Sequence, residues 1–393
     1  MKFKLKLFFF VQYLSVGIVG PYFALYLYQK DFTGSQIGLL LGSMPVAVML
    51  LQPIWSTLSD VLNTRRNLLV ISSIAMSVSI LGLGASTQYL PTVIWVILYA
   101  AFRAPIQPIS TAIVLDYLEE EQRPQDFGFT RLWGSLAFAI SSMLLGSLFL
   151  DNILDYFSWI LFGLYLLSAG ISLLMPEREA RFQLRIIDGL QFLPKNPEFL
   201  LYLLGSAFIG GTISIALSYQ TIFLQTLESP PWLLGLTVSL PALLEVPLMF
   251  LVPVLSKRLS WSLMILIGAV ALPIRWALYL FIENPAWILP TQILHSIAVV
   301  SFMVVGVSFI DKRIHQKWRA TSQGLYSTAM GGVGSGVGLY LAGNVLDRFD
   351  VRAIWVLNFI LGLLGLLFIL FALRKYQVIA QEEKIEVDSC QVM

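Results

Sequence analysis

The 393-residue sequence has little cysteine, histidine or charge. Its one cysteine, Cys390, rules out a disulfide framework within the chain and a metal site built from cysteines. Charged residues make up 12%, whereas soluble domains ordinarily carry about 25%. The sequence contains no H-E-x-x-H or G-x-S-x-G motif, and its glycine-rich run at 331–338 lacks the Lys-Ser/Thr ending of a phosphate-binding loop. We therefore expect no enzymatic activity, no cofactor and no bound metal ion.

Long apolar runs are what the sequence has instead. Hydrophobic residues make up 57% of the chain. Twelve runs reach the length of about 20 residues that a helix needs to cross a hydrocarbon core of about 30 Å. They occupy roughly residues 7–28, 37–58, 67–87, 93–115, 128–150, 157–175, 199–223, 233–254, 262–282, 287–310, 323–343 and 353–373. We expect an all-α membrane protein with twelve transmembrane helices.

The connections between these runs are short, except for a polar one after the sixth run. This division predicts an N-terminal six-helix half over residues 1–176 and a C-terminal six-helix half over residues 199–374. A cytoplasmic linker over residues 177–198 joins the two halves. Residues 375–393 form a polar cytoplasmic tail, which we expect to be disordered.

Lysine and arginine lie almost wholly on one side of the predicted helices. If the N-terminus is cytoplasmic, only Lys30, Arg348 and Arg352 fall in external loops, and only Arg103 and Arg275 fall within the spans. The others of the 25 basic residues are then cytoplasmic, as the positive-inside rule requires. We therefore expect a multi-pass protein of the plasma (inner) membrane with both termini in the cytoplasm.

The cytoplasmic turn after the second run combines one carboxylate with two arginines: Asp60, Arg65 and Arg66. Such a turn can hold neighbouring helix ends in one conformation and release them in another, or it can be an ordinary basic loop. It resembles the signature of the major facilitator superfamily, G-x-x-x-D-R-x-G-R-R, although Ser56 and Asn63 stand where glycines are usual. The resemblance implies that Asp60, Arg65 and Arg66 act as a conformational gate.

Three runs of the C-terminal half each contain one deep polar residue: Glu245, Arg275 and His295. Each costs about 2.5–3.5 kcal/mol at the centre of a bilayer, so residues of this kind usually face a shared cavity. A carboxylate near a movable arginine takes up and releases a proton as the distance between them changes, which suits proton coupling. The alternative is a fixed Glu245–Arg275 pair that only neutralises two buried charges.

The N-terminal half supplies two further arginines. Arg103 lies too deep in the fourth run for its side chain to reach the interface easily, so it either lines a cavity or bonds to a structural partner such as a helix carbonyl. Arg131 lies near the inner boundary of the fifth run, where hydropathy alone favours a topological role. Residues 131–138 resemble the fifth helix of the phenylpropionate-transporter branch of the superfamily, and more distantly that of lactose permease. The resemblance implies that Arg131 binds substrate from within the cavity.

The C-terminal half carries the same resemblance. Residues 243–247, 273–276 and 292–296 are similar to the eighth, ninth and tenth helices of the phenylpropionate-transporter family, and lactose permease has the same pattern of Glu, Arg and His. The resemblance implies roles in substrate binding and proton handling. Ala298 stands where lactose permease has a proton-carrying glutamate, so Glu245 is the best remaining proton carrier and His295 the second.

The sequence thus predicts a secondary active transporter that works by alternating access. We expect proton-coupled import of a small organic solute such as an aromatic acid, a nucleoside or a short saccharide. An exporter or an uncoupled facilitator of the same fold is the alternative, and a membrane enzyme or receptor is a more remote one. The expected partners are the solute, protons and the lipid bilayer, without nucleic acid, and we expect a monomer.

Overall fold

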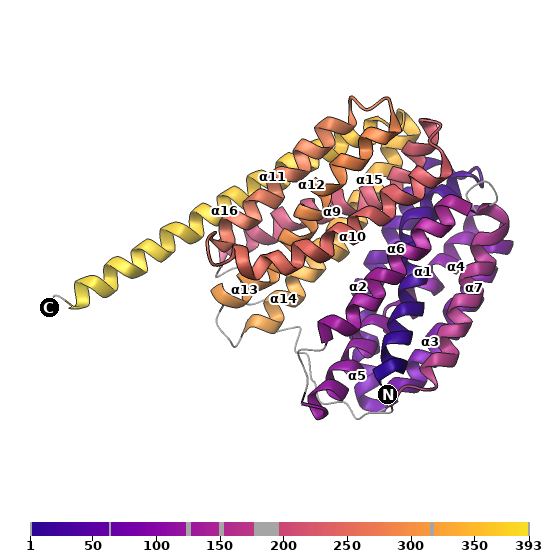
Figure 1. The fold of residues 1–393 in the computed structure, drawn as a ribbon, viewed down its shortest axis with the longest axis horizontal. Coiled ribbons are helices and arrows are strands. Elements are labelled where there is room, and N and C mark those ends of the chain that lie inside the picture. The colour runs from indigo at the N-terminus through magenta and orange to yellow at the C-terminus, as the bar shows by residue number, and fades with distance from the viewer. Residues whose placement is uncertain are drawn as a thin grey trace.

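The computed structural model describes residues 2–62, 64–122, 127–148, 153–176, 196–314 and 318–391. Within these ranges all regular structure is helical (Figure 1). Ten segments are long and apolar enough to cross a membrane. Helix α7 (Ile153–Ser172) and the series α14, η7 and α15 (319–348) take the places of the remaining two predicted spans. The predicted all-α membrane fold is confirmed.

The N-terminal half consists of seven described helices, because its fourth span is divided in two. Helix α1 packs against α6 and α7, and α3 packs against α4 and α7. The bounds are α1 (Lys2–Tyr28), α2 (Gly34–Leu62), α3 (Arg65–Ala85), α4 (Tyr89–Arg103), α5 (Ile106–Glu120), α6 (Phe127–Leu148) and α7 (Ile153–Ser172).

The C-terminal half begins with α9 and ends with the long α16. Helix α9 packs against α16, and α11 packs against both α12 and α16. The bounds are α9 (Pro197–Thr226), α10 (Pro231–Leu255), α11 (Trp261–Tyr279), the short 3-10 helix η4 (Pro285–Trp287), α12 (Ile288–Val300), the π-helix η5 (Ser301–Gly306), α13 (Val307–Arg313), α14 (Arg319–Ser327), the π-helix η7 (Thr328–Gly334), α15 (Ser335–Arg348) and α16 (Ala353–Gln391).

The break in the fourth span follows from a proline. Pro105 has no N–H, so it cannot donate a hydrogen bond to the carbonyl of Ala101 one turn earlier. The indole N–H of Trp55 in α2 donates to that carbonyl instead, at 2.8 Å. The sequence predicts one uninterrupted helix here, but the structure has α4 ending at Arg103 and α5 starting at Ile106.

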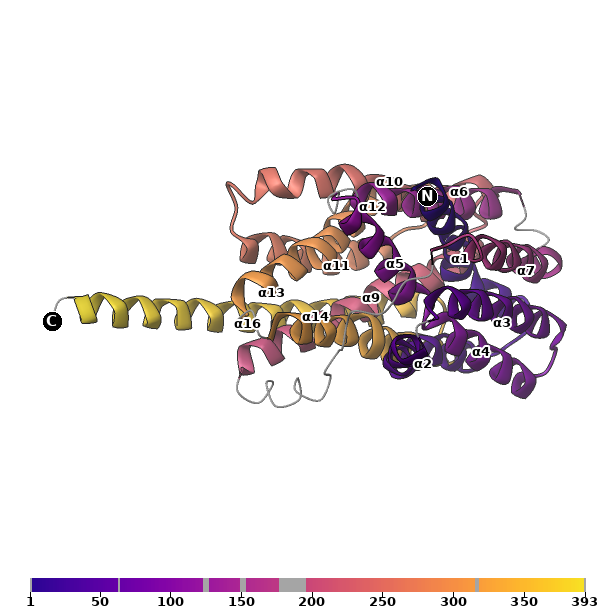
Figure 2. The same ribbon diagram turned by 90° about the horizontal axis from the view of Figure 1, so that it is seen from below.

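The expectation of a disordered tail is wrong. Helix α16 continues to Gln391, and Figure 2 shows its end projecting away from the rest of the molecule. Residues 374–391 contain no glycine or proline and are rich in good helix formers such as Ala, Glu, Gln, Lys and Arg. The preceding membrane helix has already paid the nucleation cost, so these residues continue it. The predicted linker lies mostly outside the described residues, since 177–195 are not among them.

The two halves touch near the helix ends that lie farthest from the N-terminus. We call this side the distal face; it carries the connections 29–33, 86–88, 227–230, 280–287 and 349–352. The pairs α1–α9, α2–α15 and α6–α10 join the halves, and Figure 1 shows the two bundles meeting along one side.

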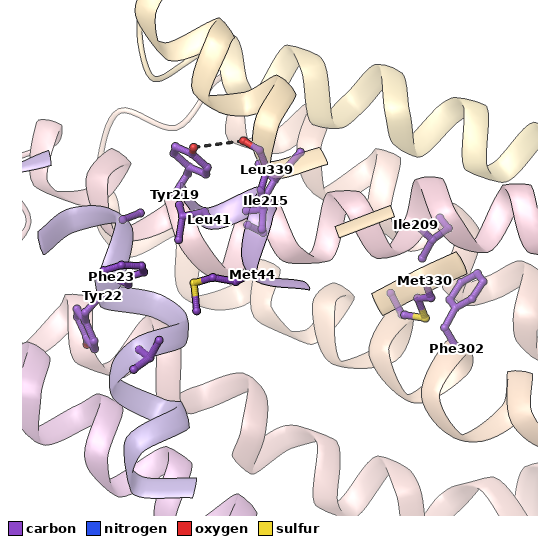
Figure 3. Packing of buried hydrophobic residues seen from close by; sticks show 14 of the residues in the cluster. Tyr22, Phe23, Leu41, Met44, Ile209, Ile215, Tyr219, Phe302, Met330 and Leu339 are labelled. Atoms are coloured by element: carbon purple, nitrogen blue, oxygen red, sulfur yellow. Dashed lines mark hydrogen bonds between the residues drawn. The ribbon is translucent and has the colours of Figure 1, made fainter. Parts of the chain in front are cut away.

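Aromatic and aliphatic side chains fill the space between the halves close to this face. Figure 3 shows Phe23 of α1 and Leu41 of α2 in the same buried cluster as Ile215 and Tyr219 of α9. A hydroxyl also crosses between the halves, since the side chain of Thr221 donates to the carbonyl of Pro21 at 2.8 Å. The interface therefore combines apolar burial with specific polar contacts.

Candidate functional site

The centre of the candidate site is a buried arginine. Arg275 of α11 is 1% exposed, and its guanidinium group makes four hydrogen-bond contacts, none of them with a carboxylate. Its Nη1 lies 2.5 Å from His295 Nδ1. Its Nη2 donates to Gln292 Oε1 at 2.9 Å, to the Tyr279 hydroxyl at 2.9 Å and to Gln220 Oε1 at 3.0 Å.

Helical spacing brings these residues together from three helices. Arg275 and Tyr279 are one turn apart on α11, and Gln292 and His295 are three residues apart on α12, so each pair shares a helix face. Gln220 comes from α9, and its Oε1 also accepts from the Tyr279 hydroxyl at 2.8 Å and from Gln292 Nε2 at 3.4 Å. This single amide oxygen therefore holds three side chains in place.

An aromatic ring covers the same guanidinium group. The Arg275 Cζ lies 4.5 Å from the ring centre of Trp276, which is fully buried, and 5.2 Å from that of Tyr279. A cation over an aromatic face is stabilised by the charge distribution of the ring. The ring contacts stabilise the positive charge of Arg275 but do not neutralise it.

Arg275 lacks an ion-pair partner among the described residues: the structure gives it no contact with a carboxylate. Its Nε also has no hydrogen-bond partner there. Buried charges in proteins are normally paired, because removing an unpaired charge from water is costly. The cluster is therefore a site of uncompensated positive charge, which favours a negative group nearby.

Glu245 is half-buried in α10, and the described part of the chain shows no hydrogen bond or ion pair to it. The fixed Glu245–Arg275 pair considered from the sequence is not formed among these contacts; Arg275 contacts His295 instead. On the same helix, Ala242 and Val246 line an apolar pocket of about 290 Å³ whose other wall is α6. Glu245 thus lies on a helix that faces the opposite half.

The two arginines of the N-terminal half lie apart from this cluster. Arg103 is half-buried at the end of α4, where the helix breaks, and Arg131 is exposed in the second turn of α6. The described contacts join neither of them to Arg275. One turn before Arg103, the hydroxyl of Tyr99 lies 2.6 Å from that of Tyr165, which forms a buried polar pair in the same half.

The structure describes the side chains of two of the three residues predicted to form a gate. Arg65 Nη1 lies 2.6 Å from Asp116 Oδ2, so the first arginine of the gate pairs with a carboxylate of α5 in its own half. Arg66 is half-buried and has further contacts. The side chain of Asp60 lies outside the described part of the structure.

Sequence reasoning missed Gln220, Tyr279, Gln292 and Asp116. Helical spacing could have found Tyr279 and Gln292, because they stand one turn from Arg275 and from His295. Gln220 had no signal beyond being an amide in an apolar run. The contact of Asp116 with Arg65 joins two helices, so no local sequence signal predicts it.

The matched family, the apolar helices and the similar proteins identify a multi-pass membrane transporter of the major facilitator type. The model of the MFS_1 like family matches residues 2–357, and the chain belongs to that family. The predicted membership of the major facilitator superfamily is confirmed.

Similar proteins are transporters of chemically different solutes. The chain is 25% identical over 385 residues to the maltose permease of Geobacillus stearothermophilus, with 96% of each chain covered. It is 28% identical over 305 residues to the probable 3-phenylpropionic acid transporter of Escherichia coli (strain K12), covering 74% of this chain and 77% of that one. Its fold matches the crystal structure of the nucleoside transporter NupG with a TM-score of 0.85 at 17% identity, covering 95% of this chain and 98% of that one.

Proposed function

We propose that the protein imports a small organic solute together with protons, and that the Arg275 cluster and Glu245 form the solute and proton site. The observation that carries the proposal is the separation of opposite charges. Arg275 is buried without a carboxylate among its described partners, and Glu245 has no described partner. A fixed structural pair would have joined the two.

The chemistry of the cluster suits a solute rich in hydrogen-bond acceptors. An arginine presents several N–H donors in a fixed plane, which match a carboxylate or a set of hydroxyl oxygens. Arg103 and Arg131 would add positive charge from the opposite wall as the halves close. An aromatic acid, a nucleoside or a short saccharide all fit this description, and transporters of such solutes are among the similar proteins.

The role of Glu245 follows from its lack of a partner. A carboxylate that enters a closed site is costly while charged and much less costly once protonated. Binding of a proton therefore favours closure of the halves over the loaded site, and release of the proton on the other side favours reopening. This cycle couples proton movement to solute movement. His295, in contact with Arg275, is the second titratable group of the site.

The predicted orientation gives the cycle its direction. With both termini in the cytoplasm, the distal face is external, and the contacts of α2 with α15 close that face. The conformation is then one in which the site opens toward the cytoplasm. We assign Asp60, Arg65 and Arg66 to the gate on the cytoplasmic side, where Arg65 already has a carboxylate partner in Asp116.

Purified protein in proteoliposomes tests the proposal. A panel of labelled aromatic acids, nucleosides and saccharides would be screened for accumulation under an imposed pH gradient, acidic outside. Glu245→Gln should abolish gradient-driven accumulation, whereas Glu283→Gln, which changes an exposed glutamate of the distal face, should not. Accumulation that survives Glu245→Gln would remove Glu245 as the proton carrier, and transport that ignores the gradient would favour a facilitator.

A further inference from the structure

The N–H groups at the start of α2 donate hydrogen bonds within their own half and to the other half. Thr33 and Gln36 satisfy each other: the Gln36 N–H donates to Thr33 Oγ1 at 3.3 Å, and the Thr33 N–H donates to Gln36 Oε1 at 3.0 Å. The Ile37 N–H donates to the Thr33 carbonyl at 2.9 Å. This capping box leaves the N–H groups of Gly34 and Ser35 without an acceptor in their own half.

A carboxylate of the C-terminal half accepts both of these hydrogen bonds. Asp347, one residue before the end of α15, takes the Gly34 N–H on Oδ1 and the Ser35 N–H on Oδ2, the latter at 2.7 Å. A negative charge at a helix N-terminus also interacts favourably with the helix dipole. The cap of one half is therefore supplied by the other half, 313 residues away in the chain.

Glycines fix the distance between the two helices. A Cβ atom on Gly38 would lie 2.8 Å from the Cα of Gly343, closer than real Cβ contacts come, so α2 and α15 touch through their backbones. Next to Asp347, Ser35 Oγ lies 3.3 Å from Asn344 Oδ1. A carboxylate at position 347 can reach the α2 N-terminus only while this close contact persists.

We propose that Asp347 is a latch that holds the distal face closed by capping α2 across the interface of the two halves. The inference rests on the alternating access of the proposed function. Opening of the distal face must separate α2 from α15, and the N–H groups of Gly34 and Ser35 then lose their acceptor. Because Asp347 is exposed, water can accept hydrogen bonds from these N–H groups in its place. The latch therefore shifts the equilibrium between the closed and open distal face but does not prevent opening.

Two basic residues near the distal face bind carbonyl groups of their own half. The ammonium group of Lys30 donates to the carbonyls of Leu83, Gly84 and Ser86 at the end of α3. Arg352 donates to the carbonyls of Leu280 and Ile282 at the end of α11. Both contacts stay within one half, so they persist when the halves separate.

Asp350 offers a matched control. It lies three residues after Asp347, and its Oδ1 accepts the Ala353 N–H at 2.9 Å at the start of α16. This is the same capping chemistry, but donor and acceptor belong to the same half. Opening of the distal face leaves this cap intact, so its loss should not change the balance between open and closed states.

The test measures a distance across the distal face in the full-length protein. Cys390→Ser removes the one native cysteine, and Thr87→Cys with Glu283→Cys places spin labels on exposed distal positions of the two halves. Pulsed electron spin resonance in proteoliposomes without solute then gives the ratio of long to short distances. Asp347→Asn removes the negative charge at the α2 N-terminus and one of the two acceptor oxygens, which should raise this ratio about 2- to 30-fold. Asp347→Glu should restore part of the short population, and Asp350→Asn should match the parent.

An unchanged ratio in Asp347→Asn, relative to Asp350→Asn, would overturn the latch. Recovery of folded protein in equal amounts from both variants keeps that comparison valid. The measurement needs no solute, so it remains separate from the transport assay. A native protein that moved no solute would contradict the proposed function, while a shifted distance ratio would still support the latch.

Discussion

Replacement of Gln220 by glutamate tests directly whether Arg275 is a charge without a fixed partner. Gln220 uses only its Oε1 in the described contacts, where it accepts from Arg275, Tyr279 and Gln292. Glutamate of the same length therefore keeps every one of these acceptor contacts and adds a negative charge. The variant differs from the native protein chiefly in the net charge of the cluster.

The magnitude follows from the geometry. Two unit charges 3.0 Å apart attract by about 5 kcal/mol at an effective dielectric constant of about 20, and desolvation of the new carboxylate costs several kcal/mol. We therefore expect the thermal stability of Gln220→Glu to stay close to native. The Arg275 charge, however, becomes neutralised, and the solute loses a charge-assisted hydrogen bond worth about 1.5–3 kcal/mol. The apparent KM for transport should rise about 10- to 150-fold.

Gln220→Leu is the matched variant that removes the acceptor without adding charge. It leaves the Tyr279 hydroxyl and the Gln292 amide without their shared acceptor and removes one acceptor of Arg275. Each unsatisfied group lowers the free energy of unfolding by about 1–3 kcal/mol. It should lower the melting temperature, whereas Gln220→Glu should not. A stable Gln220→Glu protein that transports with native KM would refute the reasoning, because the positive charge of Arg275 would then be irrelevant to the solute.

Three further predictions concern the interface and the gate. Gly343→Ala should force α2 and α15 apart, since its Cβ would collide with Gly34 and Gly38, and labels across the distal face should report a larger open population. Burial raises the pKa of Asp347, but hydrogen bonds from Ser35, Gly34 and Thr33 outweigh it and hold that pKa below its usual value. The contribution of the latch to closure is therefore complete above the ordinary carboxyl pKa of about 4 and is lost as pH falls through the lowered pKa. The closed population should stay constant from about pH 8 to 5. A double-mutant cycle of Arg65→Gln and Asp116→Asn should give a coupling energy of about 1–3 kcal/mol in thermal unfolding, and additive effects would contradict the ion pair.

The long elements and the ionisable residues of the site could be predicted from the sequence because each depends on local properties. A run of about 20 apolar residues identifies a membrane helix by its length, and Arg275 and His295 are conspicuous because charge is rare in such runs. The structure brings these two side chains into contact, with Arg275 Nη1 2.5 Å from His295 Nδ1.

Contacts between elements could not be predicted in the same way. The Glu245–Arg275 pair was considered because opposite charges attract, but neutral amides and a phenol of three helices surround the guanidinium group instead. Which face of each helix meets its neighbour depends on packing, and apolar runs with little amphipathic pattern do not encode it. The contact of Asp347 with the start of α2 depends in addition on the conformational state of the transporter.

Two local features of the sequence favour structures that differ from those predicted by average composition. Proline at position 105 removes a helix hydrogen bond and favours the break after Arg103, whereas the hydropathy of the fourth run predicts one helix. The absence of glycine and proline after residue 374 favours continuation of α16, yet composition alone suggested disorder. In both cases the hydrogen-bonding capacity and helix propensity of individual residues determine the structure more than the average hydropathy of the segment.

Proton uptake driven by solute is the measurement that tests the central claim most directly. Proteoliposomes in lightly buffered medium, without an imposed gradient, would receive the best solute of the panel while a pH electrode follows the external medium. The native protein should make the medium more alkaline as solute enters, and Glu245→Gln should carry solute down its gradient with no such change. Equal alkalinisation by Glu245→Gln and the native protein would contradict the assignment of the proton site to Glu245.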